Sequence, residues 1–327
     1  MVDACDLLSL ERPVLQAAMG GVSRRELVVA VSEAGGLGTL GYLPPDAFAA
    51  ELRAIDERLA GRAYAANLLL PIVTRAHISA CLAAPVPIVT LFFGFDQPLL
   101  TALKEAGKIV LFQVGDETEA ARAIAGGADG LIAQGFEAGG HLRGETPLAT
   151  LLPKLRARFP DHPIIGAGGV HDAASAAACR ALGADAVCAG TRFLASPEAA
   201  AHDAYKTALI EADGTVVTQL FGVGWRDPHR VIPNAATKRW CSAEGREPRY
   251  LKPLHAAARA ASRLAANDGG AAMARRQSLR FPVYTPVTLT PEMPAHLKEA
   301  VALYAGVCVK DVTSVKPAPE IVSDLAP

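Results

Sequence analysis

The sequence has few aromatic residues and no cysteine pairs of the kind that bind metals. Aromatic residues make up 6% of the 327 residues, whereas hydrophobic residues make up 51%. This balance favours helices packed closely on a sheet over a binding surface built from rings. The six cysteines are scattered without a C-x-x-C pair, and no Cys/His cluster has the spacing of a zinc site. We therefore expect reduced thiols, mostly in the core, and no metal.

Excess charge of one sign and long apolar runs are also absent. The formal net charge is −1, which gives no reason to expect nucleic acid or an anionic membrane as a partner. No apolar run approaches the roughly 20 residues that span a bilayer. The charged N-terminal segment, with Asp3, Asp6 and Arg12, lacks the apolar region of a signal peptide. We expect a cytoplasmic protein with small-molecule partners, and the sequence does not indicate an oligomeric state.

Short apolar runs alternate with alanine-rich helical patterns as far as about residue 212. The runs are apolar throughout, which is typical of parallel strands covered on both faces. The expected strands are Pro13–Ala17, Leu37–Leu40, Ala63–Leu68, Ile88–Phe92, Lys108–Val114, Gly130–Ala133, Pro163–Ala167 and Ala186–Ala189. The expected helices are Ser23–Glu33, Pro45–Ala60, Thr74–Leu82, Pro98–Ala106, Glu117–Ala125, Leu148–Arg158, Asp172–Leu182 and Pro197–Ala212.

Eight strands, each followed by a helix, predict an α/β fold of the (β/α)8 TIM-barrel type. An open doubly wound sheet is the alternative, but the first turn, residues 18–22, lacks the G-x-G-x-x-G fingerprint. Ser23, three residues before Glu26, predicts a capping box, and Pro197 predicts a first-turn position.

Beyond residue 212 the pattern changes. We expect residues 1–235 to form the barrel and residues 236–327 to form a helical and proline-rich segment packed on it. Within this segment we expect a helix at Leu254–Ala266 and a final helix at about Ala295–Gly306.

Two glycine loops follow the seventh and eighth expected strands, at Gly166–Val170 and Ala189–Phe193. Glycine allows backbone N–H groups to approach a phosphate, and a helix N-terminus beside them adds partial positive charge. The last two loops of a TIM barrel commonly form its phosphate site. The pattern therefore predicts phosphate binding.

The loop after the sixth strand, Gln134–Gly144, carries His141 among small residues. Histidine exchanges protons near neutral pH, so His141 is the candidate for acid–base chemistry. We expect the other seven histidines to be surface residues that cap or solvate a loop, because most lie on helices or exposed connections; they are residues 77, 162, 171, 202, 229, 255 and 296.

Six motifs in order resemble the nitronate monooxygenase family and also the related flavin-dependent enoyl-acyl-carrier-protein reductases. The resemblance covers residues 10–212, with a weaker echo at Leu303–Gly306. The motifs are Gln16–Gly20, Ala34–Gly38, Asn67, Gln134–His141, Gly166–Val170 and Gly190–Phe193. In this chain Ala18 replaces the usual proline, and Leu142 separates His141 from Arg143, which puts an anion-binding role for Arg143 in doubt.

The resemblance implies FMN bound on the barrel, with His141 contacting substrate as the catalytic residue. It implies that the phosphate is held by Gly168, Gly169, Gly190 and Thr191. Around the ring system and ribityl chain it implies Ala18, Met19, Asn67, Gln134 and the backbone of Gly139. Gln113, at the end of the fifth strand, is a further candidate. Alternatively, Asn67 and Gln134 satisfy hydrogen bonds at the barrel rim, and Ala18 and Met19 pack a turn. Phe92 and Phe93 either line the substrate cavity or belong to the core, and residues 221–234 are expected to shape the same cavity.

The resemblance implies oxidation of an alkyl nitronate, or of its parent nitroalkane, by O₂ without a nicotinamide cofactor. His141 would accept a proton from a neutral nitroalkane or, as imidazolium, stabilise the nitronate. Two alternatives remain open: an NAD(P)H-dependent reductase of an enoyl thioester or quinone, and a flavin-binding protein without turnover.

Overall fold

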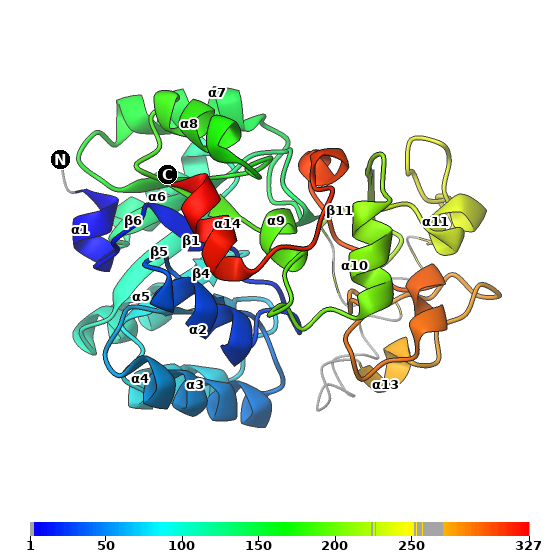
Figure 1. The fold of residues 1–327 in the computed structure, drawn as a ribbon, viewed down its shortest axis with the longest axis horizontal. Coiled ribbons are helices and arrows are strands. Elements are labelled where there is room, and N and C mark those ends of the chain that lie inside the picture. Colours follow the sequence, from blue (N-terminus) through cyan, green and yellow to red (C-terminus); the bar gives the residue numbers. More distant parts are fainter. Residues whose placement is uncertain are drawn as a thin grey trace.

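A computed structural model describes residues 3–223, 225, 227–251, 253, 257 and 271–326. The expected helix at Leu254–Ala266 therefore lies outside the described residues, apart from Pro253 beside it and Ala257 within it. Figure 1 shows a barrel of strands and helices joined to a second group of elements that contains β11, α10, α11 and α13.

Eight parallel strands form one sheet in the order β1-β9-β8-β6-β5-β4-β3-β2. A parallel bridge between Leu15 and Leu37, with Gln16 N donating to Leu37 O at 2.9 Å, joins the two ends. The predicted (β/α)8 barrel is thus confirmed, and every expected strand is present with slightly shifted ends. The strands are β1 (Val14–Gln16), β2 (Thr39–Leu40), β3 (Ala65–Leu69), β4 (Ile88–Phe92), β5 (Ile109–Val114), β6 (Gly130–Gln134), β8 (Ile164–Ala167) and β9 (Ala186–Ala189).

Seven helices follow the first seven barrel strands as expected. They are α2 (Arg25–Glu33), α3 (Pro45–Leu59), α4 (Arg75–Ala83), α5 (Gln97–Glu105), α6 (Glu117–Ala125), α7 (Leu148–Arg158) and α8 (Ala173–Ala181). The predicted capping box at Ser23 is wrong, because Arg24 is the N-cap of α2 and makes no side-chain cap. Ser23 is buried instead, and its hydroxyl accepts hydrogen bonds from Met19 N at 3.0 Å and from Gln16 Nε2 at 2.7 Å.

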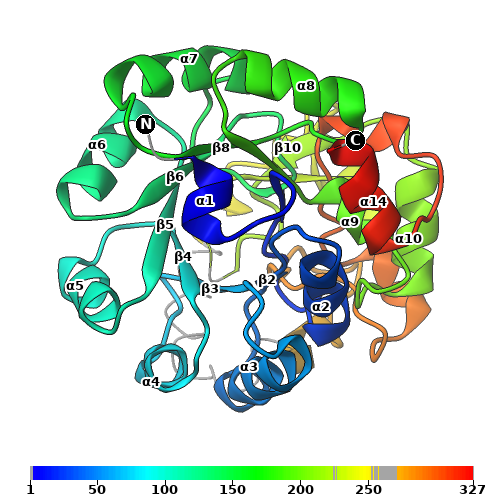
Figure 2. The same ribbon diagram turned by 60° about the vertical axis from the view of Figure 1, so that its left-hand side comes forward.

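The eighth helix of the ring comes from a distant part of the chain. The helix expected at Pro197–Ala212 begins later than predicted, as α10 (Asp203–Ile210), and a short helix α9 (Thr191–Leu194) precedes it. Pro197 lies in the connection between them, and the side chain of His202 caps α10. The place between α2 and α8 is taken by α14 (Ala318–Leu325), which packs against α2, α8 and α9 (Figure 2).

The barrel core has two layers, one inside the strands and one between strands and helices. Leu15, Ile88 and Ile165 point into the barrel, whereas Val14, Val89 and Ile164 pack under the helices. The short helix α1 (Ala4–Leu8) adds Ala4 and Leu8 to the inner layer and covers that end of the barrel (Figure 2). The other end of the barrel, at the carboxyl ends of the strands, holds the candidate site. All six cysteines are free thiols, as expected.

A small antiparallel sheet lies over the strand ends. Its order is β10 (Val216–Thr218), β11 (His229–Val231) and β7 (Gly140–His141), and β7 belongs to the loop after β6. The other elements of the described part of the chain are α11 (Ala235–Trp240), α13 (Ala271–Ala274) and two 3₁₀ helices, η1 (Ala295–Glu299) and η2 (Val307–Asp311). The final helix expected at Ala295–Gly306 is wrong, because after η1 the chain extends to bridge Val231 through Tyr304. Across the described part of the chain, no helix combines the length and apolarity of a membrane span.

Candidate active site

One cavity of about 560 Å³ opens at the carboxyl ends of the barrel strands. Its size is within the usual range of small-molecule and cofactor sites, about 300–1,000 Å³. Every site residue predicted from the sequence lines it. These residues are Ala18, Met19, Asn67, Gln113, Gln134, Gly139, His141, Gly168, Gly169, Gly190 and Thr191.

The loops after β8 and β9 form a cradle of exposed backbone amides. Gly168 and Gly169 adopt positive φ angles of 139° and 75°, which side chains rarely tolerate. Among the described residues, the N–H groups of Gly168, Gly169 and Gly190 have no hydrogen-bond acceptor. A Cβ at Gly169 would meet no atom closer than 3.9 Å, so this position is open to the cavity. Free amides in an open, glycine-lined concavity fit a phosphate.

The C-terminal segment reaches this cradle. Gly306 N donates to Thr191 Oγ1 at 2.8 Å, and Val307 N donates to Glu137 O at 3.0 Å. The approach is so close that a Cβ on Gly139 would lie 2.5 Å from the backbone of Ala305. The weak motif echo at Leu303–Gly306 is therefore part of the cavity wall. It packs against the loops that bear the stronger motifs.

Three polar side chains at the strand ends differ in how they are used. Asn67 Nδ2 donates to Thr90 Oγ1 at 2.8 Å. Gln134 Nε2 donates to the backbone oxygen of His141 at 2.9 Å, and Gln134 Oε1 accepts from Arg143 N at 3.0 Å. The rim-satisfying role considered for Asn67 and Gln134 accounts for these bonds. Gln113 also lines the cavity, but its side-chain amide bonds to no other described residue and is available to a ligand.

The strand pairing of β7 with β11 holds His141. His141 lies opposite His229, and Gly140 lies opposite Arg230. The buried Arg230 also donates from Nη2 to Phe136 O at 2.7 Å and from Nε to Ala138 O at 3.2 Å. One arginine thereby anchors both the strand and the turn that precedes it.

Aromatic rings surround the imidazole of His141. The ring centroids of Trp225, Tyr304, His229 and Phe93 lie 4.5, 5.1, 5.6 and 6.1 Å away. Burial lowers the pKa of His141 to about 3, so the ring is neutral at physiological pH. Its Nε2 is buried and has no hydrogen-bond partner among the described residues. His141 thus presents an unused proton-transfer atom within an apolar enclosure.

Several of these neighbours could not be found from the sequence. His229 was expected at the surface, but it is fully buried against His141. His77 caps α4 as expected, with its Nδ1 accepting from Thr74 N at 3.3 Å, but it is buried beneath Tyr42 and Phe48. The only sequence signal for Tyr304 was its place in the weak motif match at Leu303–Gly306. Phe92 and Phe93 line the cavity and also form a buried apolar cluster with Trp225, so both roles considered for them are present. A left-handed φ of 62° places Phe93 there, and such strain in a buried residue is commonest at functional sites.

Arg143 does not line the cavity, in keeping with the displacement that Leu142 introduces. Its Nε contacts Glu119 at 2.5 Å and its Nη1 lies 3.5 Å from Asp227. The arginine stabilises the outer side of the loop and has both neighbouring carboxylates as partners. This placement agrees with the doubt that Arg143 binds an anion in the site.

A closed barrel whose strand-end cavity holds unpaired backbone amides and a partly buried, neutral histidine has the architecture of a TIM-barrel enzyme. Comparison with known sequences makes this assignment specific. The chain belongs to the nitronate monooxygenase family, whose model matches residues 3–78 and 70–327.

Relatives with different names resemble the chain to a similar degree. A (3aS,4S,5R,7aS)-5-hydroxy-7a-methyl-1-oxo-octahydro-1H-indene-4-carboxyl-CoA dehydrogenase of Mycobacterium tuberculosis is 33% identical over 235 residues, covering 69% of this chain and 64% of the relative. FabK from Thermotoga maritima superposes with a TM-score of 0.77 and 29% identity, covering 99% of this chain and 95% of FabK. A nitroalkane oxidase from Streptomyces ansochromogenes gives a TM-score of 0.74 and 28% identity, covering 97% of this chain and 95% of the oxidase. The protein is therefore an oxidoreductase, and its substrate needs a separate argument.

Proposed function

We propose that this protein oxidises alkyl nitronates with O₂ by means of bound FMN. The observation that carries the proposal is the position of His141. Its neutral ring, with Nε2 unbonded among the described residues, lies in the same cavity as the free amides of Gly168, Gly169 and Gly190. The family assignment supports the same chemistry.

FMN fits the residues present better than FAD. Among the described residues the cavity has one glycine-lined cradle, and the sequence has no second nucleotide-binding motif. We assign the phosphate to Gly168, Gly169, Gly190 and Thr191. We assign the ring system and ribityl chain to Ala18, Met19, Asn67, Gln113, Gln134 and Gly139. When bound, FMN supplies the electron-transfer chemistry, and the protein orients the substrate and manages its charge.

We assign His141 the role of the base that accepts a proton from a neutral nitroalkane. A low pKa makes the free imidazole a weak base, but the nitronate formed beside it would carry a negative charge. An opposite charge within about 4–6 Å raises a histidine pKa. The imidazolium would then stabilise the nitronate, so the two roles considered for His141 become successive states of one residue. The surrounding rings exclude the water that would otherwise solvate both charges.

Oxygen uptake tests this proposal. The holoenzyme is assayed with a preformed nitronate and with its parent nitroalkane, without NADH. We expect uptake that depends on enzyme, with FMN as the only flavin released on denaturation. Release of FAD, or a colourless protein that FMN cannot reconstitute, would contradict the cofactor assignment. No uptake with a range of nitronates would contradict the reaction.

The outer end of the cavity favours a second candidate, an oxidoreductase of acyl thioesters. Arg24 and Arg275 line this end, beyond the residues assigned to the flavin. Relatives named as a CoA dehydrogenase and as FabK support it. The discriminating measurement is reduction of the bound flavin under nitrogen, with NADH or with a saturated acyl-CoA as donor. Enzyme-dependent oxygen uptake, or reduction of the bound flavin by either donor, would also exclude a flavin-binding protein without activity.

A further inference from the structure

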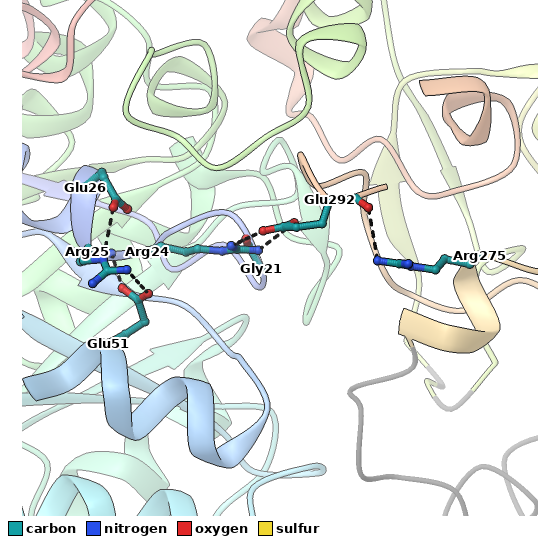
Figure 3. Close-up of polar contacts among 7 residues, drawn as sticks. All are labelled: Gly21, Arg24, Arg25, Glu26, Glu51, Arg275 and Glu292. Atoms are coloured by element: carbon teal, nitrogen blue, oxygen red, sulfur yellow. Dashed lines mark hydrogen bonds and ion pairs between the residues drawn. The ribbon is translucent and has the colours of Figure 1, made fainter. Parts of the chain in front are cut away.

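The outer end of the cavity is charged, in contrast to the aromatic wall around His141. Arg24, Glu51, Arg275 and Glu292 line it (Figure 3). Glu51 is already engaged, because one of its oxygens accepts from Arg25 N at 2.8 Å and the other lies 3.7 Å from Arg25 Nη2. Of the carboxylates that the structure describes here, only that of Glu292 is left facing Arg24 and Arg275.

Both arginines converge on Glu292. Arg24 directs Nη1 and Nη2 at the two carboxylate oxygens, at 2.5 and 3.3 Å. Arg275 donates from Nη2 to the backbone oxygen of the same residue at 3.2 Å, and Figure 3 shows it on the opposite side of Glu292 from Arg24. Within the described chain, Arg275 has no carboxylate partner. Among the described residues, two guanidinium groups at the mouth, those of Arg24 and Arg275, therefore lie against one carboxylate, that of Glu292.

Arg24 is held ready for this contact. Its Nε donates to Gly21 O at 2.9 Å, which fixes the plane of the guanidinium and turns its other two nitrogens toward Glu292. An immobilised guanidinium fork matches carboxylate and phosphate oxygens equally well. The hydrogen bond from Arg24 also lowers the pKa of Glu292 to about 2, so an oxyanion at this position is strongly favoured.

We propose that the cavity mouth is a binding site for the phosphate groups of a substrate carrier, in which the Glu292 carboxylate occupies the anion position until a ligand displaces it. Half of the Glu292 side chain is exposed, which leaves it room to swing away. Arg24 and Arg275 then bind the ligand phosphate. The inference rests on the second candidate function above, because a small nitronate has no group to place at the mouth.

The carrier that matches both ends of the cavity is a phosphopantetheine thioester such as acyl-CoA. Its acyl group suits the aromatic wall of Phe93 and Trp225. The polar arm leads outward, and the phosphates reach the arginines. A nicotinamide dinucleotide carries similar phosphates, so the experiment must separate these two sources.

Binding to the flavin-loaded protein tests the inference without requiring turnover. The probes are coenzyme A and pantetheine, which share an arm but differ in the phosphates. Arg275→Gln should raise the Kd for coenzyme A about tenfold, the scale of one charge-assisted hydrogen bond. Glu292→Gln should lower that Kd several-fold, because it removes the competing carboxylate. Neither variant should change pantetheine binding, and added salt should weaken only coenzyme A.

Arg276→Gln is the matched control. Arg276 follows Arg275 directly, is also exposed, and does not line the cavity, so its loss should leave the Kd for coenzyme A unchanged. No binding of coenzyme A, or the same response in Arg275→Gln and Arg276→Gln, would overturn the inference. The pattern appearing with NADPH and not with coenzyme A would overturn the thioester assignment. Nitronate-dependent oxygen uptake, measured in parallel, reports separately on the first proposed reaction.

Discussion

The side-chain amide of Gln134 holds the loop of His141 from both directions. Its Nε2 donates to the carbonyl of His141 at 2.9 Å, and its Oε1 accepts from the N–H of Arg143 at 3.0 Å. Gln134 is the last residue of β6, so the barrel itself fixes the height of the histidine above the strand ends. Gln134 therefore positions the His141 loop in addition to the flavin contact assigned to it.

Replacing Gln134 with Leu should lower kcat while most of the flavin is retained. The change leaves a carbonyl and an N–H without partners, and a displacement of about 1 Å at a reacting group can cost on the order of 100-fold in rate. Gln134→Glu keeps the acceptor for Arg143 and should recover part of the loss. The checks are kcat and the flavin absorbance per protein. An unchanged kcat in Gln134→Leu would rule out this positioning role.

The His141→Asn variant separates proton removal from binding. Turnover of a neutral nitroalkane should fall by roughly 10²–10⁴-fold, the usual contribution of positioned acid–base catalysis. Oxidation of the preformed nitronate should fall much less, because no proton has to be removed. Flavin content should stay near that of the unmodified protein, and the exposed His296→Asn serves as control. If His141→Asn lowered the rates with the nitroalkane and the nitronate by the same factor, His141 would not be the base.

The buried imidazole also makes stability depend on pH. The pKa of His141 is about 3 in the folded protein, against about 6.5 for an unperturbed histidine. Between these values the unfolded chain binds the extra proton, so the free energy of unfolding should decline as the pH falls from 6.5 toward 3. Urea unfolding at pH 7 and pH 4.5 measures this decline. It should be smaller in His141→Asn, and an equal decline in both proteins would contradict the burial of a neutral ring.

Gly169→Asp should abolish FMN retention and leave the barrel folded. The new carboxylate would occupy the phosphate cradle, where like charges cost several kcal/mol. Gly107→Asp is a close control, because Gly107 has a φ of 73°, close to the 75° of Gly169. A Cβ added at Gly107 would meet no atom within 4 Å, and this residue lies outside the cavity. Circular dichroism reports the fold, and flavin absorbance reports retention. If both variants lost FMN equally, backbone strain would be the cause.

Phe93→Gly should raise the pKa of His141 toward its usual value. Removing the ring admits water beside the imidazole, and glycine adopts the φ of 62° without strain. The acid limb of the nitroalkane pH–rate profile should therefore move to higher pH. Phe93→Leu keeps much of the bulk and should move the limb less. A profile that stays fixed in Phe93→Gly would show that Phe93 does not exclude water from His141.

Local patterns made most of the barrel predictable. The strands β4 and β9 lie where their apolar runs predicted them, and the glycine loops after β8 and β9 come from contiguous motifs. Ser23 was misassigned because its spacing to Glu26 fits a capping box, whereas burial directs its hydroxyl to Gln16 and Met19. A hydroxyl takes whichever partner the packed structure offers. Sequence spacing alone does not choose between them.

The surroundings of His141 could not be predicted, because they depend on pairings between distant residues. His229 reaches His141 only through the β7–β11 pairing, and Tyr304 only through its bridge to Val231. The segments involved are two or three residues long, which is too short for a periodic signal. The side chain of Gln113 differs from that of Asn67 in having no partner among the described residues, and no sequence pattern encodes that difference.

The position of α14 has a consequence for synthesis on the ribosome. The groove between α2 and α8 is filled by a helix that is translated long after β9, and Arg12 Nη1 donates to Ala326 O at 2.5 Å beside it. Nascent chains that end after β9 therefore carry all eight barrel strands but leave an apolar groove uncovered, since Ile321, Val322 and Leu325 are fully buried in the finished protein. The apolar side chains of the barrel along this groove therefore stay uncovered during translation until α14 is made.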